Sequence, residues 1–319
     1  MAGVWILAES RNQTFELLSA AVQLAEKLGT QVSAFIWEDA GSAQEYITRG
    51  ADQVLVLPPL AADQPLESYV PVIVAEAKQQ KPDIFLVAAT SRGKEMAARI
   101  AASLHTGLCS GCTALRLDET NQVLVMERLV YGGAAVQTVT CPTRPQMATI
   151  SPRTFAAAAP IPGRKGVVKE LNASSPSPVK VLERKPKVRQ SEDITEARVL
   201  VCVGRGIEKE ADMAMVRELA EAIGGELGCT RPIAEELHWL PEETYIGLSG
   251  QKVKPDIYIG IGISGQIQHV TGIRDSRYIC AVNRDENAEI FGISDYGIVG
   301  DLYTVLPQLT QELKRALKK

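Results

Sequence analysis

The chain has 319 residues, a formal net charge of −4 and an apolar content of 45 %. This length and composition are typical of a soluble globular protein with two domains. The pI is near 5.6, and no basic stripe is present, which argues against nucleic acid as the main partner.

The first residues, MAGVWILAES, predict a β-strand and not a signal peptide. They lack a positive amino-terminal region and meet Glu9 early. No run approaches the roughly 20 apolar residues that a membrane-spanning helix needs. We therefore expect no membrane span and a cytoplasmic location.

Strands and helices alternate through the first part of the chain. Leu17, Leu18, Ala21, Leu24, Ala25 and Leu28 recur at helical spacing, and Gly29 follows as a stop. Further strands are predicted at 31–37, 52–57 and 83–90, with helices between them. This order predicts a largely parallel sheet with helices on both faces. Extended pieces between Thr113 and Ile150 are interpreted as antiparallel additions.

Two short motifs in this half invite a chemical interpretation. "SRGK" at Ser91–Lys94 resembles a phosphate loop, but the upstream glycine spacing is missing and Glu95 follows. A helix cap at Thr90 or Ser91 is favoured instead. "CSGC" at Cys109–Cys112 has no second pair to complete a zinc site, so small buried residues are favoured over a redox or metal role.

A linker separates the two halves. Residues 172–197 are rich in serine, proline and charges of both signs. We place the boundary near residue 190, which predicts domains at 1–190 and 191–319.

In the second half, polar residues follow the predicted strands. They are Arg205 after the strand Val199–Val203, Thr230 and Arg231, Ser249 in a glycine-flanked loop, residues 264–269 after a third strand, Asn283, and Asp301 before a final helix, Leu302–Leu317. Ligands of open parallel sheets bind outside the carboxyl ends of the strands. Glycine at such corners admits a phosphate, and a helix N-terminus attracts it. The pattern predicts a nucleotide-type cofactor, although no GxGxxG supports NAD.

The motifs of this half are similar to those of a known family. "VGRG", "GCTRPIAE", "YIGLSG", "KPDIYIGIGISGQIQH", "AVNRDENAEIF" and "SDYGIVGDL" resemble successive motifs of the electron-transfer flavoprotein alpha subunit. The resemblance covers Leu200 to Leu309, and it is strongest to the bacterial branch that serves acyl-CoA-linked and nitrogen-fixation-linked pathways. The first half resembles the family more loosely, through "AATSRGKEMAARIAA" and "ERLVYGGAA".

The resemblance implies a fold, a cofactor and partners. It implies an amino-terminal nucleotide-fold-like α/β domain with a structural, subunit-binding role, and a carboxyl-terminal doubly wound parallel-sheet domain that carries FAD and swivels on the linker. It also implies a heterodimer with a beta subunit, which carries AMP or a second FAD. An acyl-CoA dehydrogenase or a similar protein would be the redox partner.

The resemblance also implies residue roles. Around the flavin ring, Thr230 and Arg231 would lie beside it, Ser249 in the loop of Gly247, Leu248 and Ser249 would donate a hydrogen bond to flavin N5, and Gln268 and His269 would lie at the pyrimidine side. Arg205 would contact the FAD pyrophosphate, and the phosphate and ribityl turn would be lined by Ser264, Gly265, Gln266 and Ile267. The adenosine end would be held by Asn283, Asp301 and Leu302. A cation or strong donor near N1 and C2=O would stabilise the reduced flavin.

One position departs from the mitochondrial members of the family. They have Gln-Thr where this chain has Leu248-Ser249. The hydroxyl is kept, but one amide contact is lost, and the flavin potential would differ.

Three functions stay open. The first is an electron carrier, the second is the alpha subunit of a flavin-based bifurcating complex that oxidises NADH, and the third is a non-redox adenine-nucleotide-binding protein. No nucleophile–base pair supports hydrolysis. His269 could also be a core histidine, and Arg205 and Arg231 could be surface ion-pair formers.

Overall fold

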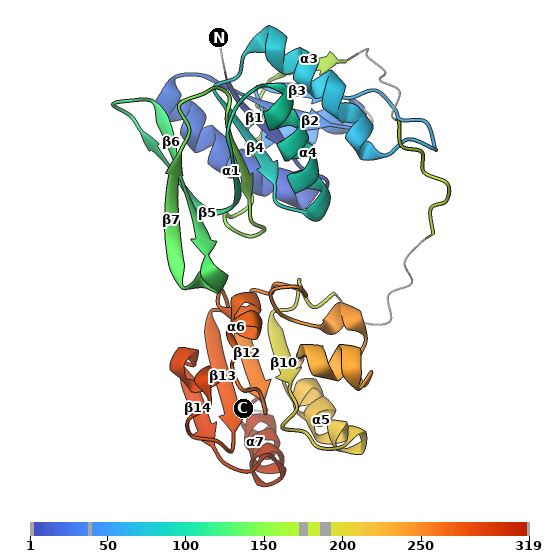
Figure 1. Ribbon diagram of the computed structural model, residues 1–319, viewed down its shortest axis with the longest axis vertical. Coiled ribbons are helices and arrows are strands. Elements are labelled where there is room, and N and C mark those ends of the chain that lie inside the picture. Colours follow the sequence, from blue (N-terminus) through green and yellow to red (C-terminus); the bar gives the residue numbers. More distant parts are fainter. Residues whose placement is uncertain (1–2, 38–39, 172–177, 186–192, 318–319) are drawn as a thin grey trace. The chain divides into compact units, whose positions relative to one another are not determined.

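The computed structural model describes residues 3–37, 40–171, 178–185 and 193–317. The chain forms two compact units, Met1–Lys185 and Pro186–Lys319, called here the amino-terminal and the carboxyl-terminal unit (Figure 1). Each unit has its own α/β fold. The boundary expected at residue 190 lies outside the described residues and stays a prediction.

The amino-terminal unit is built on a mixed sheet with the strand order β7-β6-β5-β8-β4-β1-β2-β3-β9. The strands are β1 Gly3–Leu7, β2 Gln31–Ile36, β3 Gln53–Val56, β4 Ile84–Ala88, β5 Leu108–Asp118, β6 Val123–Val130, β7 Ala135–Thr140, β8 Gln146–Ile150 and β9 Val167–Glu170. The expected antiparallel additions are confirmed for β6 and β7. In contrast, β8 inserts parallel between β4 and β5, where all of its residues are buried.

Helices cover both faces of this sheet, as expected. They are α1 Arg11–Leu28, α2 Ala43–Thr48, α3 Val70–Gln80 and α4 Ser91–Ser103. Alternate residues of β1 face opposite ways: Val4 and Ile6 pack in the core under α1, whereas Trp5 and Leu7 pack in the core under α3 and α4. Strands buried on both faces are nearly continuous apolar runs, which is why the sequence pattern predicted them.

The first turn of α4 is capped by Thr90, one of the two residues proposed for this role. The Thr90 hydroxyl accepts a hydrogen bond from the Gly93 N–H at 2.8 Å. We expect Thr90→Ala to lower the free energy of unfolding by at least about 1 kcal/mol, the usual cost of losing an N-cap, because the variant also loses the hydrogen bond from the Thr90 hydroxyl to the Glu9 carboxylate. Ser91→Ala, at the exposed neighbouring position, serves as the control and is expected to cost less than about 0.5 kcal/mol. Urea unfolding followed by tryptophan fluorescence tests this, and equal losses in both variants would contradict it.

The carboxyl-terminal unit is built on a parallel five-stranded sheet with the order β11-β10-β12-β13-β14. Its strands are β10 Val199–Val203, β11 Glu226–Cys229, β12 Ile257–Ile261, β13 Tyr278–Asn283 and β14 Tyr296–Val299, and its helices are α5 Met213–Ile223, α6 Ile267–Ile273 and α7 Leu302–Leu317. Residues of α5 and α7 pack on one face, and Ile273 of α6 packs on the other (Figure 1). The predicted doubly wound parallel sheet is confirmed.

The strand order of this unit reverses between β10 and β12. The chain leaves β10 toward β11 on one side of it, and later returns to β12 on the other side. Connections that diverge in this way leave a crevice at the carboxyl ends of the two central strands, where ligands of open α/β sheets bind.

Among the described residues, no helix is long and apolar enough to cross a membrane.

Candidate functional site

A cavity of about 1010 Å³ opens at this crevice of the carboxyl-terminal unit. Its wall contains most of the residues that the sequence singled out, namely Arg205, Thr230, Arg231, Leu248, Ser249, Ser264, Gln266, Gln268, His269 and Asn283. These residues follow β10, β11, β12 and β13 or lie in the loop before β12. The parallel sheet therefore brings together residues that are up to 78 positions apart, from Arg205 to Asn283.

Five other expected residues, Gly247, Gly265, Ile267, Asp301 and Leu302, are not among the residues that line the cavity. The Asp301 carboxylate accepts a hydrogen bond from the Thr304 N–H at 3.1 Å, so it caps α7. Leu302 is buried in the core on that face of the sheet. Ile267 begins α6 and is partly exposed. A cofactor role for these residues through their backbone stays a proposal.

Glycines let the ends of β10 and β12 approach each other closely. The Gly206 N–H donates to the Gly262 carbonyl at 3.0 Å. A Cβ atom on Gly206 would lie 2.5 Å from Gly262 Cα, which a real side chain cannot do. This part of the cavity wall is thus formed by bare backbone, which is suited to close contact with a phosphate group.

Arginines bring positive charge to the cavity wall. Arg231 follows β11 and precedes the π-helical turn Pro232–Glu236, and its Nε donates to Glu235 at 2.6 Å. Arg205 forms no ion pair with any residue that the structure describes. An exposed guanidinium between glycines can bind a phosphate through two parallel hydrogen bonds.

The loop before β12 carries Ser249 at the cavity wall. The Ser249 hydroxyl lies 3.0 Å from the Tyr245 hydroxyl, so its position is held by a neighbour in the same loop. The Leu248 N–H donates to the Gln268 carbonyl at 2.7 Å, which ties this loop to the start of α6. The Leu248 side chain is 55 % exposed. The loop therefore presents a hydroxyl and an apolar group side by side.

His269 lies in the cavity wall, and its ring nitrogens have partners within the protein. Its Nδ1 is 3.1 Å from the Ile246 carbonyl, and its Nε2 is 2.7 Å from the Tyr258 hydroxyl. Burial lowers the pKa of His269 to about 4. The imidazole is therefore neutral at neutral pH, because removing a charged ring from water is costly. Both ring nitrogens are bonded to the protein, which the sequence pattern could not indicate.

The buried ring gives the protein a defined pH dependence. An unfolded histidine takes up a proton near pH 6.5, whereas the folded pKa is about 4. Between these values the unfolded state binds more protons, so stability falls as the pH falls from 6.5 toward 4. At pH 5 we expect the His269 contribution to have fallen by about 2 kcal/mol relative to neutral pH.

This expectation is tested by urea unfolding at pH 7 and pH 5, with maleimide labelling of the buried Cys202 as the probe of the carboxyl-terminal unit. His269→Gln should reduce the difference in the free energy of unfolding between pH 7 and pH 5 by about 2 kcal/mol. His238→Gln, at an exposed position of the same unit, is the control and should keep it. An unchanged difference in His269→Gln would contradict the prediction.

Sequence reasoning missed several residues of the cavity wall and of the layer behind it. Tyr245, Arg284, Asp285 and residues 287–289 line the cavity. Tyr258 lies behind His269. The available signal for Tyr258 was a large polar aromatic residue inside an apolar strand, because a fully buried tyrosine hydroxyl needs a partner.

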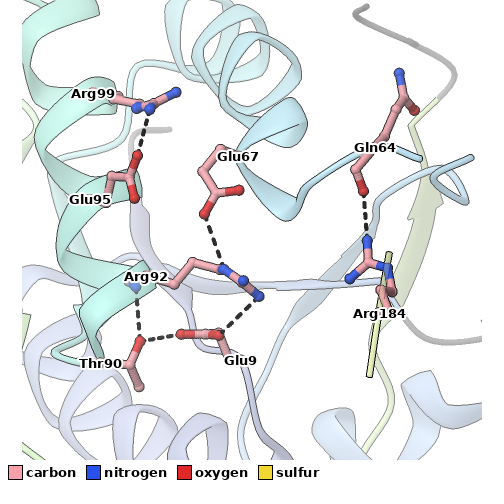
Figure 2. A network of polar contacts seen from close by, with 9 residues as sticks. Glu9, Gln64, Glu67, Thr90, Arg92, Glu95, Arg99 and Arg184 are labelled. Atoms are coloured by element: carbon pink, nitrogen blue, oxygen red, sulfur yellow. Dashed lines mark hydrogen bonds and ion pairs between the residues drawn. The ribbon is translucent and has the colours of Figure 1, made fainter. Parts of the chain in front are cut away.

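The corresponding position of the amino-terminal unit is filled by its own side chains. At the carboxyl ends of β1 and β4, the Glu9 carboxylate accepts from the Thr90 hydroxyl and pairs with Arg92, which also pairs with Glu67 at 3.1 Å (Figure 2). The cavity beside Glu9 measures about 10 Å³, no more than a single water needs. As formed by the described residues, this crevice is too small for a nucleotide.

The two cysteines of the CxxC motif, Cys109 and Cys112, are buried in the core, as favoured from the sequence. Burial raises the pKa of the Cys112 thiol well above its ordinary range, so it stays protonated. Within the described ranges, no group of three or more His, Cys, Asp or Glu residues could hold a metal ion.

The cavity of the carboxyl-terminal unit fits a dinucleotide cofactor. Its volume is at the upper end of the 300–1,000 Å³ range of ligand pockets, glycines leave part of its wall as bare backbone, and the wall also carries arginines, hydroxyls and amides. The fold and the site thus define a nucleotide-cofactor-binding α/β protein.

Comparisons with known families and proteins identify the class further. Residues 4–176 match the family described as "Electron transfer flavoprotein domain", and residues 193–274 match "Electron transfer flavoprotein FAD-binding domain". The chain belongs to the electron-transfer flavoprotein family, as an alpha-subunit member, and its carboxyl-terminal unit binds FAD.

Several known proteins are similar in sequence to this chain over nearly its whole length. The chain is 36 % identical to "Electron transfer flavoprotein subunit alpha" of Thermoanaerobacterium thermosaccharolyticum, covering 98 % of each chain. It is 37 % identical to "Protein FixB" of Clostridium saccharobutylicum, covering 99 % of this chain and 97 % of that one. It is 36 % identical to "Protein FixB" of Escherichia coli, covering 98 % of each.

A solved structure of a thiamin diphosphate-dependent enzyme from Mycobacterium smegmatis aligns with a TM-score of 0.25 and 11 % identity. That alignment covers 96 % of this chain and 59 % of the other. The likeness is too weak to bear on fold or function.

Proposed function

We propose that this chain is the alpha subunit of a heterodimeric electron carrier. Its FAD passes electrons between a dehydrogenase, which we propose to be acyl-CoA-linked, and a second redox partner. The observation that supports this most strongly is the cavity at the carboxyl ends of four parallel strands, whose wall brings Arg205, Arg231, Ser249 and His269 together within the region that matches the FAD-binding family.

FAD, when bound, supplies reversible electron-transfer chemistry through its isoalloxazine ring. The chain itself binds and orients the cofactor. We propose that Arg205 and the glycine backbone at the ends of β10 and β12 hold the phosphates. We propose that Arg231, after β11, and Ser249, in the loop before β12, hold the flavin ring. Fixed donors aimed at developing negative charge favour the reduced form, because they need no reorganisation when the charge appears.

We propose that the amino-terminal unit binds the beta subunit. Its sheet ends in two edge strands, β7 and β9, and exposed edges of this kind readily pair with another chain. Apolar side chains are exposed along them: Val136 on β7, Val167 and Val168 on β9, and Tyr131 between β6 and β7. The filled crevice at Glu9 supports a structural role for this unit. Whether the beta subunit carries AMP or a second FAD is decided by that subunit.

The proposal is tested by co-purifying the chain with its beta partner and measuring the visible spectrum and the flavin-to-protein ratio, before and after adding NADH without oxygen. One FAD per heterodimer, unchanged by NADH and reduced by an acyl-CoA dehydrogenase with its substrate, is the expected result. Two flavins bleached by NADH would replace the simple shuttle with a bifurcating complex. A heterodimer without flavin would overturn the electron-carrier function in favour of a non-redox nucleotide-binding protein.

A further inference from the structure

The loop that carries Ser249 folds around one tyrosine ring. Tyr245 opens this loop, lines the cofactor cavity and is only 7 % exposed. A Cβ atom on Gly250 would lie 2.7 Å from Cδ1 of the ring, and one on Gly247 would lie 3.1 Å from its hydroxyl oxygen. The backbone therefore passes close to the ring at two glycines, where a larger residue would press against it.

The Tyr245 ring is held from two sides. It packs in the core with residues of α5 and α7. Its own loop closes around it, because the Gln251 N–H donates to the Tyr245 carbonyl at 2.7 Å. The next residue, Ile246, donates its N–H to the Cys229 carbonyl at 2.9 Å, which anchors the loop at the end of β11. The ring is thus a fixed part of the cavity wall.

The fixed ring delivers its hydroxyl to Ser249. The two hydroxyl oxygens lie 3.0 Å apart, and neither group has another hydrogen-bond partner among the residues that the structure describes. Each hydroxyl has one hydrogen and two lone pairs, so either of them can be the donor. Ser249 is exposed and lines the cavity. Its remaining hydrogen-bonding capacity is therefore available to a group in the cavity.

We propose that Tyr245 is a positioning residue for Ser249, whose hydroxyl it keeps directed into the cavity through a hydrogen bond that reverses with the state of the cofactor. This inference rests on the proposed function, since it concerns the wall that would face the flavin. When Ser249 donates to a group in the cavity, the Tyr245 hydroxyl donates to Ser249. When that group carries a hydrogen, Ser249 accepts the bond and turns its own hydrogen to the Tyr245 oxygen.

A reversible pair of this kind suits a cofactor atom that accepts a hydrogen bond in one oxidation state and donates one in the other. A lone serine hydroxyl rotates among staggered positions, and binding would have to fix it. The Tyr245 hydroxyl fixes it beforehand, which lowers the ordering cost of binding. Removing the Tyr245 hydroxyl should therefore weaken the site through Ser249, without any contact between Tyr245 and the cofactor.

The contact between the two hydroxyls is tested in the full chain without flavin. The protein has eight tyrosines, and with ¹³C-labelled tyrosine the Tyr245 Cζ signal is assigned through bonds to its own backbone. Ser249→Ala is expected to move this signal, because the phenol loses its partner. Ser276→Ala is the matched control, since its hydroxyl donates to the Ile273 carbonyl, and it should leave the signal in place. An unmoved Tyr245 signal in folded Ser249→Ala would overturn the proposal.

The coupling is tested by titrating the heterodimer with FAD. Tyr245→Phe keeps the ring and is expected to weaken binding by about threefold to tenfold, the contribution of one neutral hydrogen bond. In the Ser249→Ala background the same change should cause no further loss. Tyr278→Phe, at the amino end of β13 and away from the cavity, is the control and should have no effect. Equal losses from Tyr245→Phe with and without the Ser249 hydroxyl would mean that the tyrosine acts by packing alone.

The reduction potential of the bound FAD gives a readout that packing alone would not move. Tyr245→Phe is expected to lower it by up to about 30 mV, a tenfold change in a two-electron equilibrium. The reason is that the Ser249 hydrogen has no acceptor when the cofactor atom carries a hydrogen, and an unpaired donor costs more than an unpaired lone pair. The shift should vanish in the Ser249→Ala background, and a wild-type potential in Tyr245→Phe would contradict the reversal.

Failure of this inference and failure of the proposed function are distinguishable. The NMR signal of Tyr245 does not require flavin. The flavin-to-protein ratio of the wild-type heterodimer, in turn, does not depend on the contact between Tyr245 and Ser249.

Discussion

Replacing Gly265 with alanine is expected to weaken FAD binding by about 100-fold or more and to lower the free energy of unfolding by about 3 kcal/mol. Gly265 has φ +89°, a conformation that strains any residue with a side chain. Its Cβ would also meet the backbone of Glu289 at 2.7 Å and that of Ile290 still more closely. The turn after β12 would therefore have to move away from the segment that contains Glu289 and Ile290.

That segment matters because the Ile290 N–H donates to the Ser264 carbonyl at 3.0 Å. This bond links two segments of the cavity wall, since Ser264 and Glu289 both line the cavity. FAD titration by fluorescence quenching and urea unfolding would measure the two effects. Gly292→Ala is the control, because a Cβ at Gly292 meets nothing within 4 Å. Equal effects in the two variants would show that the close contact at Gly265 is unimportant.

Removing the Arg205 guanidinium is expected to weaken FAD binding by about 10- to 100-fold, the usual contribution of a charge-assisted hydrogen bond. Arg205 lies between the two glycines after β10, and no described residue neutralises it. Arg205→Lys should recover only part of the affinity, because an ammonium group cannot bind a phosphate with two parallel hydrogen bonds. The loss should shrink at high salt, where charges are screened.

The control for this variant is an arginine at the opposite, amino end of β10. Arg198 precedes β10 and pairs with Asp256 at 2.8 Å, at the edge of the sheet opposite to the cavity. Arg198→Ala should leave FAD affinity unchanged and alter stability by less than about 1 kcal/mol, as for exposed ion pairs. Titration of each variant with FAD, at two salt concentrations, compares the two ends. A similar loss at both positions would mean that general charge, and not the phosphate site, controls affinity.

The sequence by itself determined most of the strands and helices, and it predicted that the site lies at the carboxyl ends of the parallel strands. Apolar patterns located β10 and α7 with their observed bounds, because buried strands and amphipathic helices leave local patterns. Polar residues after successive strands predicted one cluster, because parallel strands end at the same edge. Arg205, Arg231 and Ser249 do lie in the wall of one cavity.

Only the tertiary structure decided which of these residues face the cavity and in what chemical state. β8 was grouped with antiparallel pieces, yet it joins the parallel core, because strand pairing depends on segments far apart in the chain. Asp301 follows a strand like the others, but its carboxylate turns back to cap α7. His269 is neutral because burial lowers its pKa, and its ring nitrogens lie within hydrogen-bond distance of the Ile246 carbonyl and the Tyr258 hydroxyl. Hydrogen-bond partners and desolvation are properties of packed neighbours, and local sequence carries no record of them.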